Sequence, residues 1–300
     1  MSYSTEILDL IGNTPLIKLT RFTDMSLYAK AEFLNPGGSV KDRVAKHIIF
    51  EAEKNGTLTP GMLIVEATTG NTGIGIALVG VQRGHPVKIV MPENMSEERK
   101  KIIRALGAEL ILTPGKKGVD ECVRLANEIA RREDGWRLNQ FDNPLNPETH
   151  YLFTGREIWE SLEGKVHAFV AGVGSGGTLG GVGKFLKERN PAVRIIAVEP
   201  KQTAALLKQE PGLHAIQGIG DGFVPSCLDT QLIDDLITVS DEDAIRTTRE
   251  LARTQGLLVG TSSGANVWAA AFIARGLGPT FNVVTILPDR AERYFSTALI

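Results

Sequence analysis

From about Leu63 onward, short apolar runs rich in Val and Ile alternate with longer runs whose apolar residues recur at helical spacing. The short runs are typical of buried strands, and the longer ones of amphipathic helices. Strands are predicted at 63–67, 87–91, 109–112, 168–171, 194–198 and 282–287. Helices are predicted at 74–83, 96–106, 119–132, 149–162, 179–189, 241–255 and 263–275. This alternation predicts an α/β fold with mostly parallel sheets and helices on both faces of each sheet.

The pattern is interrupted at 142–147, a polar stretch that contains two prolines. This stretch is the best candidate for a domain boundary. A chain of 300 residues also exceeds the usual size of a single hydrophobic core. We therefore expect two doubly wound α/β domains with a cleft between them, because such sheets place their ligands at strand-to-helix turns.

Charge and composition exclude only a few classes of function. The formal net charge is -2 and 42% of the residues are hydrophobic, with no basic stripe, so nucleic-acid binding is not expected. No apolar stretch approaches the length of a membrane span, and the N-terminus lacks a basic region followed by an apolar one, so we expect a cytoplasmic protein without membrane contact. The two cysteines and five histidines are scattered without ligand spacing, and no metal is expected.

Lys41 stands at the start of a predicted helix that ends near Asn55. The preceding turn and Ser39, as the N-cap, place Lys41 in the first helical turn, where the helix dipole costs a cation roughly 0.3–1 kcal/mol. That field lowers the pKa of the amine, and burial would lower it further. A neutral amine is what reaction with an aldehyde requires. Taken alone, Lys41 could also be a surface lysine whose side chain extends into solvent.

A polar turn at 68–73 lies between a predicted strand and a predicted helix. Its glycines let the backbone approach a ligand, and its threonines, Asn71 and the helix N-terminal amides offer hydrogen bonds to a carboxylate. By itself, the turn could equally be a polar connection with a threonine N-cap. The turn at 261–265 also allows two interpretations. Its hydroxyl groups could reach the ring nitrogen of a ligand, or they could cap the following helix.

A glycine-rich turn at 172–178 also joins a predicted strand to a predicted helix, and the backbone amides of such a turn bind phosphate. Three of its glycines satisfy the dinucleotide-binding spacing, and Glu199 follows at the place of a ribose-binding acid. An NAD-dependent oxidoreductase is therefore an alternative. It is disfavoured because a complete α/β half precedes the turn, and because Lys41 and the turn at 68–73 would have no function.

The chain resembles the cysteine synthase / cystathionine β-synthase family of pyridoxal-phosphate enzymes in four signature turns. These are NPGGSVKDR at 35–43, TTGNTG at 68–73, GSGGT at 174–178 and TSSGA at 261–265. The resemblance implies the fold-type II architecture, which is like that of the tryptophan synthase β subunit. It further implies a smaller, mobile N-terminal α/β domain at 35–145 with the carboxylate loop, and a larger phosphate-binding α/β domain formed by 1–34 and 146–300.

The resemblance also implies a role for each matching residue. Lys41 is expected to hold pyridoxal 5′-phosphate covalently and to act in catalysis, Asn71 to bond the 3′ oxygen of the ring, and Ser262 to face the ring nitrogen. The residues expected to bind the phosphate are Gly174, Ser175, Gly176, Gly177 and Thr178. The residues expected to bind the substrate are Thr68, Thr69, Gly70, Thr72, Gln140 and Gly220.

The activity that the resemblance implies is β-replacement, which forms L-cysteine from O-acetyl-L-serine and sulfide by way of an aminoacrylate. A serine opposite the ring nitrogen, in place of a carboxylate, leaves that nitrogen largely unprotonated and favours loss of a β-substituent over transamination. Two alternatives are condensation of serine with homocysteine, as in cystathionine β-synthase, and O-phosphoserine-dependent cysteine synthesis. A third is a noncatalytic homologue that binds the tail of serine acetyltransferase, although Lys41 argues against it. The family also implies a homodimer and serine acetyltransferase as a partner.

Three residues bear on substrate choice. Thr69 and Ser175 depart from the family pattern, in which serine and threonine respectively are common, and the methyl group of Thr69 crowds the carboxylate site. Asp221 lies in the segment 218–223, which is expected at the mouth of the cleft. Its charge could steer an amine-bearing second substrate such as homocysteine, but a solvated turn residue is the interpretation we favour.

Overall fold

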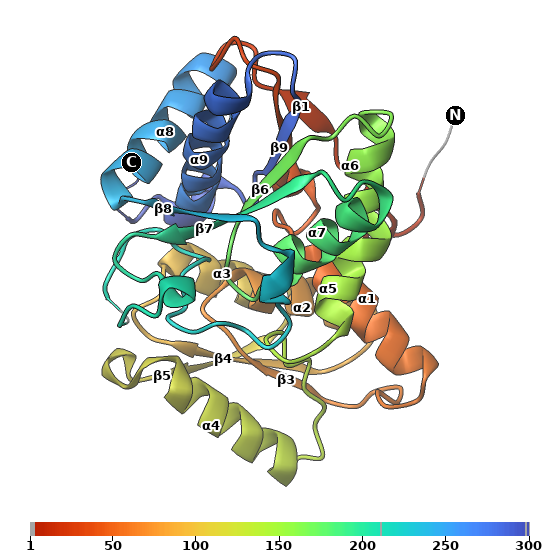
Figure 1. Cartoon of the computed structure of the whole chain (residues 1–300). Coiled ribbons are helices and arrows are strands. Elements are labelled where there is room, and N and C mark those ends of the chain that lie inside the picture. The colour runs from red at the N-terminus through yellow and green to blue at the C-terminus, as the bar shows by residue number, and fades with distance from the viewer. Residues whose placement is uncertain (1–3, 211, 298, 300) are drawn as a thin grey trace.

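The described part of the protein forms two separate β-sheets with helices packed around them (Figure 1). Its structure, a computed structural model, describes residues 4–210, 212–297 and 299; residues 1–3 of the predicted larger domain, with 211, 298 and 300, lie outside the described part. The larger sheet has the order β1-β2-β9-β6-β7-β8, formed by Leu16–Lys18, Leu27–Lys30, Val283–Ile286, Ala168–Gly172, Arg194–Pro200 and Asp235–Val239. The smaller sheet has the order β3-β4-β5, formed by Ile64–Ala67, Val87–Pro92 and Glu109–Thr113.

Among the described residues, every strand pair is parallel except β1 with β2. The predicted α/β class with mostly parallel sheets is therefore confirmed. The α-helices are α1 (Lys41–Lys54), α2 (Asn71–Gln82), α3 (Glu97–Ala105), α4 (Gly118–Arg132), α5 (Leu145–Thr149), α6 (Arg156–Ser161), α7 (Gly177–Arg189), α8 (Asp241–Gln255) and α9 (Thr261–Leu277). The 3-10 helices are Ile7–Leu10, Glu32–Leu34, Gly115–Lys117, Ala205–Leu207, Thr230–Leu232 and Ala291–Tyr294, and His150–Gly155 is a π-helix.

The stretch 142–147, which interrupts the predicted pattern of strands and helices, is partly helical. The short helix α5 begins at Leu145 and leads through the π-helix at His150–Gly155 into α6, so the predicted helix 149–162 begins four residues too late. Pro147 does not prevent this, because it lies in the first turn of α5, where the missing amide has no intrahelical acceptor to lose.

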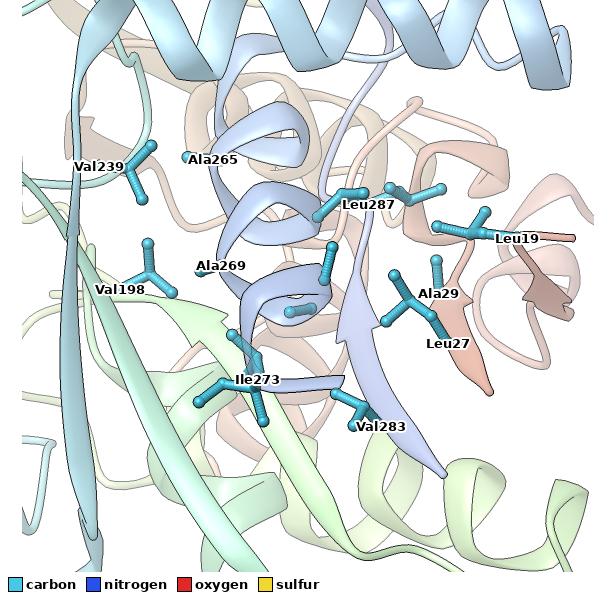
Figure 2. Close-up of a cluster of buried hydrophobic side chains, with 14 of the residues drawn as sticks. Leu19, Leu27, Ala29, Val198, Val239, Ala265, Ala269, Ile273, Val283 and Leu287 are labelled. Atoms are coloured by element: carbon cyan, nitrogen blue, oxygen red, sulfur yellow. The ribbon is translucent and has the colours of Figure 1, made fainter. Parts of the chain in front are cut away.

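The core of the larger sheet surrounds α9, a helix whose residues are mostly Ala and other small side chains. Figure 2 shows Ala265, Ala269 and Ile273 of α9 facing Val198 and Val239 of the neighbouring strands. Small residues let a helix approach a sheet closely, and close packing fixes its position. The N-terminus of α9, which carries the turn at 261–265, is therefore held rigidly against the sheet.

A second core joins the smaller sheet to α1 and α2. It includes Ile48 of α1, Ile76 of α2 and Ile89 of β4, all fully buried. The two helices approach closely at Gly75, where an added Cβ would lie 2.9 Å from the carbonyl oxygen of Lys41. The start of α1 and the start of α2 are thus brought together at one end of the smaller sheet.

Candidate active site

Lys41 begins α1 and points toward the glycine-rich turn of the other sheet. Its backbone amide donates to Ser39 Oγ at 3.2 Å, the contact expected of Ser39, although Val40 is the residue directly before the helix. Its Nζ donates to Ser175 Oγ at 3.2 Å. Desolvation lowers the pKa of Lys41, and Asp221 opposes that effect. The amine is therefore more easily deprotonated than a solvated lysine.

The lowered pKa of Lys41 predicts the pH dependence of its reaction with an aldehyde. If pyridoxal 5′-phosphate bonds to Lys41, as the resemblance implies, the rate of this reaction should rise with pH and reach half its maximum below the ordinary lysine pKa of 10.5, because only the neutral amine reacts. Absorbance during reconstitution across a pH series measures this. A midpoint at or above pH 10.5 would contradict the proposed environment of Lys41.

A buried ion network holds the start of α1 in place. Arg43 contacts Glu32 at 2.6 Å and Glu157 at 2.7 Å, and Lys30 contacts Glu157 at 2.6 Å. Burial raises the pKa of Glu32, but Arg43 more than offsets this and the pKa falls to about 2. The network joins α1 to β2 and α6, and so it fixes the helix that carries Lys41 against the larger sheet.

The glycine-rich turn follows β6 and opens α7, as predicted. Gly176 has a φ of +78, and an added Cβ would lie 2.8 Å from Leu228 Cβ. At Gly177 an added Cβ would lie 2.0 Å from Asn146 Oδ1. Both positions therefore require glycine. The first amides of α7 have no intrahelical acceptors, which makes this turn suited to bind an anion.

Two hydroxyl groups border the same turn. Ser175 Oγ accepts from Lys41 and also from Asn146 Nδ2, at 3.0 Å. Thr178 Oγ1 lies 3.3 Å from His150 Nε2. Burial lowers the pKa of His150 to about 3, so this imidazole is neutral near neutral pH. It can exchange a hydrogen bond with Thr178 but adds no charge to the site.

The turn at 68–73 follows β3 and opens α2, again as predicted. Thr68 Oγ1 accepts from the amide of Gly70 at 3.1 Å. Thr72 Oγ1 donates to Gln140 Oε1 at 2.6 Å, which places these two predicted carboxylate-binding residues together. Thr69 is half-buried, and its hydroxyl bonds to no described residue.

Asn71 is held by a residue that the sequence interpretation missed. Asn71 Nδ2 donates to Asp289 Oδ2 at 2.6 Å, and Tyr294 donates to the same oxygen at 2.5 Å. Asn71 Oδ1 is buried and has no partner among the described residues. An acceptor without a donor in a buried position is a place where a ligand group is expected. Asp289 follows β9, and its position at the carboxyl end of a predicted strand was the signal that could have found it.

The remaining predicted residues lie at two other turns. Ser262 is buried in the first turn of α9, and its hydroxyl bonds to no described residue. Gly220 has a φ of +74, donates its amide to Val173 O at 2.9 Å and accepts from His214 Nε2 at 3.0 Å. Gly220 therefore lies beside the end of β6, whereas no described hydrogen bond links Ser262 or Thr69 directly to Lys41.

These features fit pyridoxal 5′-phosphate better than a dinucleotide. The site offers a reactive amine, an anion-binding turn, the buried unpartnered Oδ1 of Asn71, and Ser262 in the first turn of α9. The acid that a dinucleotide would need, Glu199, is only 2% exposed and accepts a backbone hydrogen bond from Leu206 at 3.1 Å. The Glu199 carboxylate therefore stabilises the nearby loop that contains Leu206.

Three further findings concern the rest of the described chain. A pocket of about 350 Å³, lined by Trp136, Asn139 and neighbouring residues, contains none of the predicted site residues. Within the described part of the chain, no group of three or more His, Cys, Asp or Glu side chains is arranged to hold a metal ion. None of the helices described is long and apolar enough to cross a membrane.

Comparison with known proteins agrees with the site. The chain belongs to the family described as "Pyridoxal-phosphate dependent enzyme", which it matches over residues 7–289. It is similar to the cysteine synthase of Staphylococcus aureus (strain Mu50 / ATCC 700699), with 46% identity over 297 residues that cover 98% of this chain and 96% of the relative. Among solved structures, O-ureido-L-serine synthase has a TM-score of 0.97 at 43% identity, covering 99% of this chain and 95% of its own. The O-acetylserine dependent cystathionine beta-synthase from Helicobacter pylori has a TM-score of 0.94 at 43% identity, covering 100% and 99%.

Proposed function

We propose that this enzyme is a cysteine synthase, which forms L-cysteine from O-acetyl-L-serine and sulfide. The observation that carries the proposal is the Lys41 amine, with its lowered pKa, 3.2 Å from Ser175 of the phosphate-type turn, at the start of a helix that packs closely on α2, which the turn at 68–73 opens. The 46% identity to a cysteine synthase over nearly the full length supports it. Release of acetate from O-acetylserine, followed by formation of cysteine when sulfide is added, tests it directly.

The residues of the site would share the work as follows. Pyridoxal 5′-phosphate, when bound, supplies an electron-withdrawing ring that stabilises negative charge at the substrate Cα. Lys41 would accept the Cα proton, since its amine is the reactive base nearest the phosphate turn. Ser262 would offer the ring nitrogen a neutral hydrogen-bond partner rather than a carboxylate, and Asn71 would bind the 3′ oxygen. With the nitrogen uncharged, loss of acetate is favoured over transamination.

We further propose that residues 35–145 form the smaller, mobile domain, and that 1–34 with 146–300 form the larger one. The turn at 68–73 then lies on the smaller domain, while the phosphate turn and Ser262 lie on the larger, so a substrate bound by both would draw the domains together. The proposal includes a homodimer located in the cytoplasm, with serine acetyltransferase as a candidate partner. Sedimentation of the protein alone and with that partner tests both assemblies.

Replacing Thr72 with alanine should raise the KM for O-acetylserine roughly tenfold, because one hydrogen bond to a charged group is lost from the bound substrate. Thr72→Ser, which keeps the hydroxyl that bonds Gln140, is the matched control and should behave like the parent. In the presence of O-acetylserine, the backbone amides should be less protected from hydrogen exchange in Thr72→Ala than in the parent or in Thr72→Ser. Equal KM values for the two variants would exclude Thr72 from carboxylate binding.

A second candidate is O-acetylserine-dependent cystathionine synthesis, which the similarity to the Helicobacter pylori enzyme favours. The two candidates share the first half of the reaction and differ in the second substrate. Steady-state rates for O-acetylserine, O-phosphoserine and serine, each with sulfide and with homocysteine, would decide between them and would also test the O-phosphoserine alternative.

A further inference from the structure

Arg99 is a buried arginine at the boundary between the two proposed domains. It lies in the first turn of α3, a helix on the side of the smaller sheet that is turned toward the larger sheet (Figure 1). Only 3% of its surface is exposed. Its guanidinium carbon lies 4.7 Å from the centre of the Tyr294 ring, and its Nη1 donates to Gln217 Oε1. Because Tyr294 and Gln217 belong to the proposed larger domain, Arg99 spans the boundary.

The same side chain packs against the turn at 68–73, where the substrate carboxylate is expected. A Cβ added to Gly70 would lie 2.5 Å from Arg99 Nε and 2.6 Å from Arg99 Cδ, so the guanidinium has room only because residue 70 is glycine. Gly70 directly precedes α2, and the first amides of a helix have no intrahelical acceptors. The positive charge of Arg99 therefore lies beside the backbone that is expected to bind the carboxylate.

This charge has no acidic partner among the described residues. The two acids that precede Arg99 on α3 are bonded elsewhere: Glu97 contacts Lys100 at 2.6 Å, and Glu98 accepts from Ser296 Oγ at 2.8 Å. In addition, Arg99 Nε is buried and has no hydrogen-bond partner within the described part of the chain. A buried arginine is normally paired, because an uncompensated charge is costly away from water. These features indicate an anion that comes from outside the chain.

A carboxylate bound at the turn would benefit from such a charge. The threonine hydroxyls and backbone amides of 68–73 are neutral donors, and hydrogen bonds to neutral donors offset only part of the cost of taking a carboxylate out of water. A cation beside these donors lowers that cost. An uncharged amide in place of the carboxylate would gain far less from the cation.

We propose that Arg99 is a positioning residue for the substrate carboxylate. Acting through the backbone of Gly70, its charge makes the turn at 68–73 select a negatively charged group over a neutral one. The inference rests on the proposed function, in which this turn binds the carboxylate of an amino-acid substrate. It assigns the charge preference of the turn to a residue that lies outside it.

Binding of L-alanine and of L-alaninamide to the holoenzyme tests this assignment. The two molecules differ only at the carboxylate, and neither has a leaving group at Cβ, so binding is measured without turnover from the absorbance of the cofactor. In Arg99→Met, which removes the charge but keeps an unbranched side chain, the Kd for L-alanine should rise roughly tenfold, while that for L-alaninamide should change less than about twofold. Arg99→Lys should restore most of the preference. Comparing ratios between variants cancels the different basicity of the two amino groups.

Arg104→Met is the matched control, because Arg104 lies on the same helix and its side chain is exposed. It removes the same charge and should leave both dissociation constants unchanged. Arg99→Gln, which retains a donor for Gln217, is the second neutral variant if Arg99→Met does not fold.

Three outcomes would overturn the proposal. They are an unchanged ratio of the two dissociation constants in the neutral Arg99 variants, an equal rise for both ligands, which would show that Arg99 only supports the shape of the turn, and an equal change in Arg104→Met. If the parent binds neither ligand, the turn is not a carboxylate site and the proposal is wrong. Absence of acetate release from O-acetylserine would instead refute the proposed function, and the binding ratios would still decide the role of Arg99.

Discussion

Lys41→Ala is expected to lower kcat by roughly a thousandfold or more, because in the proposed mechanism Lys41 is both the residue that binds the cofactor covalently and the base that accepts the Cα proton. The fold should remain, since Lys41 takes no part in the buried ion network and its side chain has a single described hydrogen bond, to Ser175. Acetate release from O-acetylserine measures turnover, and thermal unfolding followed by circular dichroism measures stability.

Lys46→Ala is the matched control for this change. Lys46 lies on the same helix, and its amine donates to the carbonyl of Leu8 at 2.8 Å, away from the phosphate turn. Activity near that of the parent is expected for Lys46→Ala. Near-normal turnover in Lys41→Ala would show that another group is the base.

Gly176→Val is expected to weaken binding of pyridoxal 5′-phosphate by about a hundredfold or more. A valine at a φ of +78 is strained, and its Cβ would lie 2.8 Å from Leu228 Cβ and 2.9 Å from Pro225 Cγ, so the turn must move away from its anion-binding geometry. The quantity to measure is the cofactor retained after dialysis, with the dissociation constant from fluorescence titration.

Gly256→Val is the matched control for Gly176→Val, because it introduces backbone strain at a distance from the phosphate turn. Gly256 has a φ of +69 at the end of α8, and an added Cβ there meets no atom within 4 Å. Gly256→Val should therefore lose stability, roughly 1–2 kcal/mol, while it keeps the cofactor. If both variants retain pyridoxal 5′-phosphate as the parent does, the phosphate is bound elsewhere; tight NAD binding by the parent would restore the dehydrogenase alternative.

The elements that the sequence predicted well are those with local signals at both ends. Helix α8 has the predicted bounds, because Ser240 Oγ accepts from the amide of Asp243 at 3.1 Å and Gly256 ends the helix in a left-handed conformation. Strands β1 and β2 were missed because they are short and depend on distant partners. Leu27 of β2 pairs with Val283 of β9, and no local pattern reports such a pairing.

The same distinction holds for the site. Three turns carry Lys41, Asn71 and the phosphate-type glycines. Each turn is a single continuous segment of the sequence, so its composition could be interpreted directly. The residues that hold them come from far along the chain: Asn71 and Asp289 are 218 positions apart. The effect of Asp221 on the pKa of Lys41 could not be predicted either, because it depends on the packing of the loop 218–223 beside Gly174.

The central claim, that Lys41 is the residue to which pyridoxal 5′-phosphate is attached, is tested most directly by reduction with borohydride and peptide mapping. The purified enzyme should be yellow, and reduction should fix the cofactor on one peptide. The reduced adduct is expected on Lys41, whose amine lies 3.2 Å from Ser175 of the phosphate turn. An adduct on Lys30 or Lys46, or no adduct at all, would contradict it.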